Sequence, residues 1–116
     1  MNNHLNIIGS GLTGPLISLI LASKHACSID MYERSKDTRT DNKFSGRSIN
    51  LALSKRGIKS LEYAGIFNKD FEDILIPMYG RTIHTINGEI NFQPYGNKNN
   101  HYINSVSRYA INKNLI

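Results

Sequence analysis

An α/β fold is predicted by three features of this 116-residue sequence. Three glycines, Gly9, Gly11 and Gly14, lie between a short apolar run and a longer one that can form a helix. A second strand-like run, 27–33, follows that helix, and Asn-Gly at 87–88 separates two alternating runs further along. The first two features are typical of a Rossmann-like βαβ start, and the third is typical of an inserted β-hairpin. Because only one such βαβ unit can be found, the parallel sheet is expected to be incomplete.

The glycine turn has the spacing G-x-G-x-x-G of a dinucleotide-binding loop. In that interpretation Gly9 makes the bend, Gly11 lets backbone N–H groups approach a pyrophosphate, and Gly14 lets the helix pack close to the strand. The helix N-terminus then faces the phosphates with unpaired N–H groups and a partial positive charge. A purely structural glycine turn explains the pattern equally well, so a second observation is needed.

That observation is a carboxylate at the end of the next strand. Glu33 lies 19 residues beyond Gly14, close to the ~20 residues expected for the group that hydrogen-bonds an adenosine ribose. A carboxylate accepts hydrogen bonds from both ribose hydroxyls and repels a 2′-phosphate, which favours FAD or NAD over NADP. The alternative is a strand that ends in an exposed Glu, but the order and spacing together favour a cofactor site.

Composition limits the other functions. A hydrophobic content of 40% and a charged content of 20% are typical of a globular chain, here long enough for one small domain. The net charge is +5, but the basic residues are scattered and no nucleic-acid motif occurs, so nucleic acid is not an expected partner. Cys27 is the single cysteine and the four histidines are dispersed. An intrachain disulfide is excluded, and no metal site of the usual zinc spacing is expected.

The apolar run 16–22 is too short to cross a bilayer, and no basic segment precedes it as in a signal peptide. No membrane contact is expected from this portion, and a cytoplasmic location is the default expectation. A membrane anchor beyond residue 116 is left open. The last residues are interpreted as a strand over 102–108 and a helix over 109–116 without a stop signal, which predicts that the chain is part of something longer.

The middle of the chain is expected to alternate between loops and helices. Residues 34–45 are polar and are interpreted as an exposed loop. Ser54 can cap a helix that ends at Gly65, and a short helix is expected around 68–75. The block 46–54, which carries Arg47, is either buried core or the wall of a cofactor site. Periodicity alone favours core.

Asn-Gly at 87–88 predicts a two-residue type I′ hairpin. In that register Ile83 faces Phe92 and Arg81 faces Pro94, so Arg81 would lie at the end of the more apolar face, beside Tyr95. A guanidinium there either reaches out to water or binds an anion such as a substrate carboxylate. The residues alone favour the first interpretation.

Taken together, these stretches resemble the FAD-dependent aromatic hydroxylase family, in particular its kynurenine-hydroxylating members. The resemblance covers essentially the whole chain in the correct order. It rests on Gly9-Ser10-Gly11-Leu12-Thr13-Gly14, Asp30-Met31-Tyr32-Glu33, the block 46–54, Arg56-Gly57, Ile76-Pro77-Met78, Gly80-Arg81-Thr82-Ile83-His84, Pro94-Tyr95-Gly96, Tyr102-Ile103 and Ser105-Val106-Ser107-Arg108. The glycine turn and Glu33 are common to many flavoproteins, whereas the block 46–54 and the stretches 94–96 and 105–108 are far more specific.

The resemblance implies hydroxylation of L-kynurenine at C3 with NADPH and O2, within tryptophan degradation and NAD biosynthesis. FAD carries the oxygen chemistry, so no side chain here is expected to be catalytic. Residues 1–116 would form part of an FAD-binding domain, and 78–96 would begin the substrate-side β-sheet. Expected FAD contacts are Gly9, Gly11, Leu12, Thr13, Gly14, Glu33, Arg34, Arg47, Ala52 and Arg108. Expected substrate contacts are Arg81, paired with the amino-acid carboxylate, and Tyr95, which reverses the preference stated above for Arg81.

The sequence departs from the family at Tyr79, where members of this family have a basic residue, and this leaves the shape of the substrate pocket open. The family also needs a second flavin-binding segment with a Gly-Asp pair and the rest of a substrate domain. The isolated chain is therefore expected to be inactive and to need the remainder of the enzyme chain. Two alternatives stay open: a hydroxylase of another aromatic substrate, and a non-catalytic nucleotide-binding fragment. A plain NAD dehydrogenase is disfavoured by the hairpin and by the block 46–54.

Overall fold

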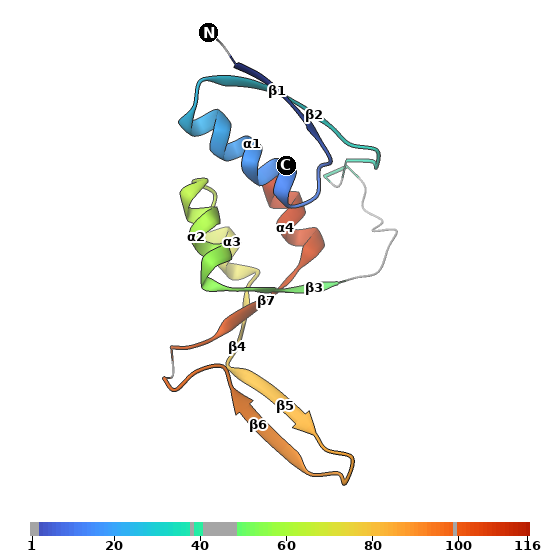
Figure 1. Ribbon diagram of the computed structural model, residues 1–116, viewed down its shortest axis with the longest axis vertical. Coiled ribbons are helices and arrows are strands. Elements are labelled where there is room, and N and C mark those ends of the chain that lie inside the picture. Colours follow the sequence, from blue (N-terminus) through green and yellow to red (C-terminus); the bar gives the residue numbers. More distant parts are fainter. Residues whose placement is uncertain (1–2, 38, 41–48, 99) are drawn as a thin grey trace.

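The computed structural model describes residues 3–37, 39–40, 49–98 and 100–116. Within these ranges three small sheets and four helices are arranged along an elongated molecule (Figure 1). Its principal extents are 62, 33 and 25 Å, and its radius of gyration is 17.8 Å. A compact domain of about 100 residues would have a radius of gyration of about 13 Å. Part of this chain therefore extends well away from its core.

The βαβ unit opens the chain. Strand β1 (Asn3–Ile8) pairs in parallel with β2 (Cys27–Tyr32), and helix α1 (Thr13–Lys24) connects them. Pro15 lies in the first turn of α1, where the missing N–H removes no intrahelical hydrogen bond. Lys24 lies in the last turn, where its charge opposes the negative end of the helix dipole. The predicted order of strand, glycine turn, helix and strand is confirmed.

An antiparallel sheet lies in the middle of the molecule (Figure 1). Its strand order is β3 (Asn50–Leu53), β7 (Ile103–Ser107) and β4 (Ile76–Met78). Helices α2 (Lys55–Tyr63) and α3 (Lys69–Asp73) come between β3 and β4 in the chain, and α4 (Arg108–Leu115) follows β7 directly. The central strand of this sheet therefore carries the helix that ends the described chain.

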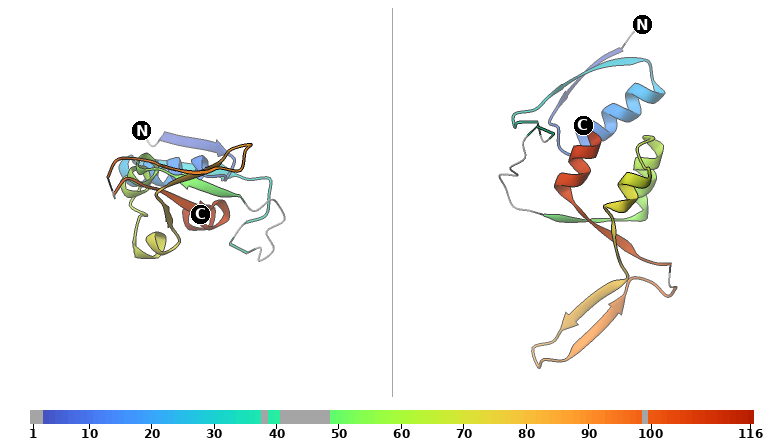
Figure 2. Two further views of the ribbon diagram at one scale, coloured as in Figure 1. Left: turned by 90° about the horizontal axis from the view of Figure 1, so that it is seen from below. Right: turned by 180° about the vertical axis from the view of Figure 1, so that it is seen from behind.

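The hydrophobic core lies where α2, α3, β7 and α4 meet. Its buried members are Leu61, Phe71, Val106, Ile111 and Leu115. Leu12, Leu16 and Leu19, at and within the start of α1, pack against this cluster as partly buried side chains. Figure 2 shows α4 beside the start of α1 when the molecule is viewed from behind. The first and last helices therefore share one core, and this brings the C-terminal helix to the glycine turn.

Strands β5 (Gly80–His84) and β6 (Ile90–Pro94) form a hairpin that extends away from the core (Figure 1). The predicted two-residue turn is wrong. The Thr85 N–H donates to the Glu89 carbonyl, the Gly88 N–H donates to the Thr85 carbonyl, and Gly88 has a φ of 84°. This pattern is a three-residue loop with a glycine in the left-handed conformation, the next most common hairpin connection.

The extra loop residue shifts the strand register by one. Arg81 faces Gln93 instead of Pro94, and Phe92 faces Thr82 instead of Ile83. Because side chains alternate between the two faces of a strand, a one-residue shift moves a residue's partners to the other face. Arg81 and Phe92 consequently lie on opposite faces of the hairpin, which corrects the expectation that they share one.

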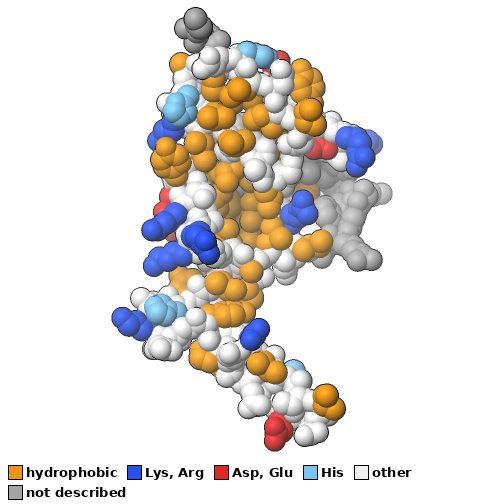
Figure 3. All heavy atoms as spheres, in the orientation of Figure 1, with side chains coloured by type: hydrophobic (Ala, Val, Ile, Leu, Met, Phe, Trp, Pro, Cys, Tyr) orange, Lys and Arg blue, Asp and Glu red, His pale blue; other side chains and the backbone are white. Residues whose placement is uncertain are grey.

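Large apolar side chains are exposed at both ends of the molecule. Among the described strands β1 and β2 pair only with each other, and Ile8 at the end of β1 is 90% exposed. In the hairpin, Ile86 is fully exposed and Phe92 is 62% exposed. Figure 3 shows hydrophobic side chains spread over one face of the molecule. The described parallel sheet is thus incomplete, as predicted.

None of the helices in the described ranges has the length and hydropathy of a bilayer span.

Candidate functional site

The glycine turn between β1 and α1 uses its three glycines differently. Gly9 has a φ of 105°, which L side chains rarely adopt, and its N–H donates to the Tyr32 carbonyl at 2.8 Å. A Cβ on Gly14 would fall far inside 3.0 Å of the Gly9 carbonyl oxygen, so only glycine lets α1 begin this close to the turn. A Cβ on Gly11 would meet no atom within 4 Å. The space beside Gly11 is open, as the approach of a ligand to its backbone requires.

Glu33 follows β2 and holds the turn from one side. Its Oε2 accepts the Ser10 N–H at 2.7 Å, and its Oε1 accepts the Ser35 N–H at 2.7 Å. These hydrogen bonds, first the one from Ser35, hold the pKa of the Glu33 carboxyl below its ordinary value of 4.5. The group is therefore a carboxylate at neutral pH. A carboxylate has about four acceptor positions, which leaves capacity for ribose hydroxyls.

Helix α4 holds the turn from the other side, through a residue that the sequence did not single out. The Asn112 Nδ2 donates to the carbonyl oxygens of Ser10 and Gly11, at 2.8 and 2.7 Å. Asn112 is 8% exposed. The available signal in the sequence was an amide between Ile111 and Leu115, within the apolar stripe of a predicted helix. An amide buried there without a partner would be costly, so its presence indicates a specific contact.

Arg108 is the first residue of α4 and lies about one turn before Asn112. The two residues therefore share a helix face, and Asn112 shows that this face is directed at the glycine turn. The start of α4 is fixed by two hydrogen bonds. The Ser107 Oγ accepts the Ala110 N–H at 3.4 Å, and the Arg108 N–H donates to the Ile49 carbonyl at 3.1 Å. Arg108 is exposed at the start of α4, on the same side of the helix as Asn112.

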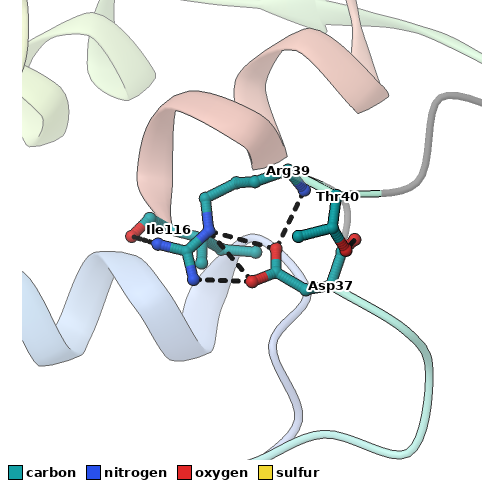
Figure 4. A network of polar contacts seen from close by, with 4 residues as sticks. All are labelled: Asp37, Arg39, Thr40 and Ile116. Atoms are coloured by element: carbon teal, nitrogen blue, oxygen red, sulfur yellow. Dashed lines mark hydrogen bonds and ion pairs between the residues drawn. The ribbon is translucent and has the colours of Figure 1, made fainter.

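The segment after Glu33 also contacts the end of α4 (Figure 4). The Arg39 Nη2 lies 2.6 Å from the Asp37 Oδ2, and the Arg39 Nη1 donates to the Ile116 carbonyl at 3.1 Å. The hydrogen bonds from Arg39 hold the pKa of the Asp37 carboxyl below its ordinary value. Arg34, one of the expected FAD contacts, lies exposed in this same segment.

The other expected cofactor residues differ in position. Leu12 is the N-cap of α1 and Thr13 is its first residue, so both belong to the turn, and the Leu12 side chain makes no cap hydrogen bond. Ala52 is exposed in β3, opposite Ser105 of β7, in the middle sheet. Arg47 lies outside the described residues.

Arg81 lies in β5 and Tyr95 directly follows β6. This hairpin is at the end of the molecule away from β1 and α1 (Figure 1). The Tyr95 N–H donates to the Tyr79 carbonyl at 2.9 Å, which continues the register that sets Arg81 opposite Gln93. Strand alternation then puts Arg81, Gln93 and Tyr95 on one face. The Arg81 Nε–H donates to the Gln93 Oε1 at 2.7 Å. The two expected substrate residues therefore share a face, but it is the more polar one.

A hollow of about 420 Å³ lies at the base of the hairpin. It is lined by Tyr79, Phe92, Pro94, the loop 96–98 and His101. Phe92 and Pro94 project from the face opposite Arg81. Neither Arg81 nor Tyr95 lines this hollow, but Tyr79, whose carbonyl accepts the Tyr95 N–H, does.

The turn, the start of α1 and Glu33 fit a dinucleotide. The first turn of a helix offers N–H groups without intrahelical partners and a partial positive charge, both suited to phosphate. The first turn of α1 carries no acidic residue, the space beside Gly11 is open, and an ionised carboxylate touches the turn at Ser10. The arrangement can therefore bind a pyrophosphate at α1 and a ribose at Glu33.

No protein-family model matches the chain. Curated relatives match almost all of it. The kynurenine 3-monooxygenase of Cytophaga hutchinsonii is 42% identical and aligns with 100% of this chain, that of Legionella pneumophila is 42% identical over 97%, and that of Anopheles gambiae is 41% identical over 95%. This chain is related to the kynurenine 3-monooxygenases. It spans about a quarter of the length of these relatives, namely 26%, 25% and 22%.

A solved structure supports the architecture independently of the kynurenine 3-monooxygenases. The 2,6-dihydroxypyridine-3-hydroxylase from Arthrobacter nicotinovorans matches with a TM-score of 0.71 and 19% sequence identity. The match covers 100% of this chain and 26% of that chain. At this identity it shows the fold alone, and the predicted α/β fold class is confirmed. The roles of individual residues and the division into a cofactor part and a substrate-side sheet stay predictions.

Proposed function

We propose that this chain is the FAD-binding part of a flavoprotein monooxygenase that hydroxylates L-kynurenine at C3, with NADPH and O2 as co-substrates. The observation that carries the proposal is the glycine turn held by Glu33, in a chain 42% identical over its full length to a kynurenine 3-monooxygenase. Residues 1–116 would form part of the FAD-binding domain, and 78–96 would begin the substrate-side sheet.

The cofactor residues have distinct roles in this proposal. The backbone N–H groups of Gly11, Leu12 and Thr13, at the start of α1, bind the pyrophosphate. The Glu33 carboxylate accepts hydrogen bonds from the ribose hydroxyls while it keeps its contact with the turn. Arg108 supplies a positive charge from α4. Arg34, Arg47 and Ala52 would complete the contacts along the flavin.

On the substrate side, Arg81 binds the amino-acid carboxylate of kynurenine. A guanidinium has five N–H donors, of which the Nε–H is used by Gln93. That contact orients the guanidinium plane, so that its Nη groups can pair with both carboxylate oxygens. Tyr95 is on the same face and would contact the same ligand. The exposed position of Arg81 agrees with a residue that meets a ligand.

Bound FAD would supply the transfer of electrons from NADPH to O2 that the hydroxylation requires. The side chains of this chain bind and orient the cofactor and the substrate, and none is assigned a nucleophilic or proton-transfer role. The isolated chain holds the start of a cofactor site, without the second flavin segment that the family resemblance implies. The isolated chain is therefore not expected to turn over.

Titration of the chain with FAD, followed by flavin fluorescence, tests the cofactor part of the proposal. Saturable binding is expected, with an affinity that falls by about tenfold or more in Gly11→Ala. Absence of FAD binding both by this chain and by the polypeptide expressed from its complete reading frame would overturn this part. Kynurenine-dependent NADPH oxidation by the chain alone is not expected, and robust turnover would contradict the assignment of these residues to one part of a larger catalytic unit.

The substrate is tested in the polypeptide expressed from its complete reading frame. Arg81→Ala is expected to raise the KM for kynurenine sharply, because the substrate carboxylate loses its charged partner. Asn91→Ala is the matched control, since Asn91 lies on the same face of the hairpin opposite Ile83. An unchanged KM in Arg81→Ala would favour the alternative of a different aromatic substrate.

A further inference from the structure

We propose that Asn112 is a positioning residue of the cofactor site: its side-chain amide sets the orientation of the peptide groups whose N–H groups bind the pyrophosphate. This inference rests on the proposed FAD-binding function and adds to it a residue from the opposite end of the described chain. Asn112 would not touch the cofactor. It would act through Ser10 and Gly11.

The side-chain amide nitrogen of Asn112 donates two hydrogen bonds. A side-chain NH2 group has two N–H donors. The Asn112 Nδ2 uses them on two consecutive carbonyls, Ser10 at 2.8 Å and Gly11 at 2.7 Å. These partners are 102 and 101 residues away in sequence. The contact therefore exists only in the folded chain.

Because the peptide group is planar, the orientation of each carbonyl also fixes the orientation of the N–H of the next residue. In a trans peptide the C=O of one residue and the N–H of the next point in opposite directions. Fixing the Ser10 carbonyl therefore directs the Gly11 N–H away from Asn112, and fixing the Gly11 carbonyl does the same for the Leu12 N–H. These two N–H groups immediately precede α1, and a Cβ at Gly11 would meet no atom within 4 Å.

The glycine turn needs contacts from other segments to fix its conformation, because its own backbone is conformationally flexible. Glycine populates more of φ/ψ space than any other residue and loses more conformational freedom when it is ordered. The Glu33 carboxylate fixes Ser10 at its N–H, and Asn112 fixes it at its carbonyl. With both ends of Ser10 and the Gly11 carbonyl restrained, the turn is ordered before a ligand arrives, which lowers the entropy lost on binding.

The position of Asn112 is itself set by the core. Its neighbours Ile111 and Leu115 are both 4% exposed and belong to the central hydrophobic cluster. The helix start is held by the Ser107 cap. Helix α4 therefore cannot rotate without unpacking the core, and the amide keeps a fixed direction. A neighbouring amide, Asn114, instead donates to Ala110 within the same helix and is exposed, so it provides a matched control.

The experiment compares Asn112→Leu and Asn112→Asp with Asn114→Leu in the whole chain. Leu keeps the volume but lacks donors, and Asp keeps the shape but sets an acceptor against two carbonyl oxygens. Both Asn112 variants are expected to raise the Kd for FAD by about tenfold or more, the effect of losing two hydrogen bonds. Asn114→Leu is expected to leave the Kd unchanged.

A second readout reports the turn itself without any ligand. In NMR spectra the Gly11 and Leu12 amides are expected to shift and to exchange faster with solvent in both Asn112 variants, and to stay unchanged in Asn114→Leu. A lower Tm with unchanged Gly11 and Leu12 amides and an unchanged Kd would mean that Asn112 only packs, and would overturn the inference.

The unmodified chain supplies a test that does not depend on the folding of a variant. The Asn112 side-chain amide protons are expected to exchange slowly, because both are hydrogen-bonded in a buried position. Exchange as fast as that of Asn114 would contradict the contact. If neither the unmodified chain nor the polypeptide expressed from its complete reading frame binds FAD, the proposed function fails, while the amide measurements still decide whether Asn112 orders the turn.

Discussion

Gly14→Ala and Gly11→Ala form a pair that separates a structural glycine turn from a cofactor-binding one. An alanine Cβ at position 14 would overlap the Gly9 carbonyl oxygen and would also lie 3.2 Å from the Gly9 carbonyl carbon. Both atoms belong to the backbone of a residue with a φ of 105°, so they cannot rotate aside as a flexible side chain would. Helix α1 must shift away from the turn.

The magnitude follows from two opposing effects. Overpacking of this kind costs about 1–3 kcal/mol. Replacing glycine by alanine inside a helix returns at most about 1 kcal/mol through helix propensity. Because the overlap with the backbone is severe, the upper end of that range applies, and Gly14→Ala is expected to destabilise the fold by about 2 kcal/mol. For a domain of this size each kcal/mol lowers the Tm by about 4–8 °C. The shift of α1 also moves the N–H groups of its first turn, so affinity for FAD is expected to fall as well.

Gly11→Ala is expected to have the opposite effect on the stability of the fold. The new Cβ meets no atom within 4 Å, and Gly11 is not among the glycines with positive φ. The substitution reduces the freedom of the unfolded chain and is expected to stabilise the fold by about 0.4–1 kcal/mol. In the proposed site the same Cβ would occupy space that the pyrophosphate needs. Affinity for FAD is expected to fall by about tenfold or more, which corresponds to about 1.4 kcal/mol.

The assays are thermal unfolding followed by circular dichroism and FAD titration followed by flavin fluorescence, on both variants and the unmodified chain. A Gly14→Ala variant as stable as the unmodified chain would refute the close approach of α1 to the turn. A Gly11→Ala variant that binds FAD normally would refute the role of this backbone in phosphate binding. The expected result is lower stability and lower affinity for FAD in Gly14→Ala, and lower affinity without lower stability in Gly11→Ala.

Three further predictions concern local features. Ser107→Ala removes a helix-cap hydrogen bond and is expected to lower the free energy of unfolding by about 1 kcal/mol. Ser54→Ala removes no cap hydrogen bond and should change the urea midpoint of unfolding little. Equal shifts of the urea midpoint in the two variants would contradict a stabilising role for the Ser107 cap. Gly88→Ala forces a side chain to a φ of 84° and is expected to cost about 1–2 kcal/mol, visible as faster amide exchange in the hairpin; unchanged exchange would argue for a different turn. The Glu33 carboxyl has a pKa below 4.5 in the folded chain, so its stabilising contribution is present above pH 4.5 and is lost as the pH falls through the folded pKa. Glu33→Gln should flatten that part of the pH–stability profile, and an unchanged profile would show that the hydrogen bonds from Ser35 and Ser10 to the Glu33 carboxylate do not stabilise the fold.

The hairpin shows which structural features local sequence patterns can predict. The alternating runs and the Asn-Gly pair predicted its two strands correctly, because alternation and glycine in a turn are local properties. They did not predict the loop length, since Asn-Gly is compatible with a two-residue type I′ turn and with a type I turn followed by a left-handed glycine. The difference of one residue moved Arg81 opposite Gln93. Only the hydrogen bonds across the strands decide between the two registers.

By itself, the sequence determined the order of elements at the glycine turn, the helix that begins after Ser107, and the position of Glu33 at the end of β2. Each depends on short-range rules: glycine conformations, capping and strand length. The tertiary structure alone decided that α4 packs beside the start of α1 and that Asn112 reaches the carbonyls of Ser10 and Gly11. That contact joins residues more than a hundred positions apart. No local pattern encodes it, because it arises from the way the shared hydrophobic core sets the two helices against each other.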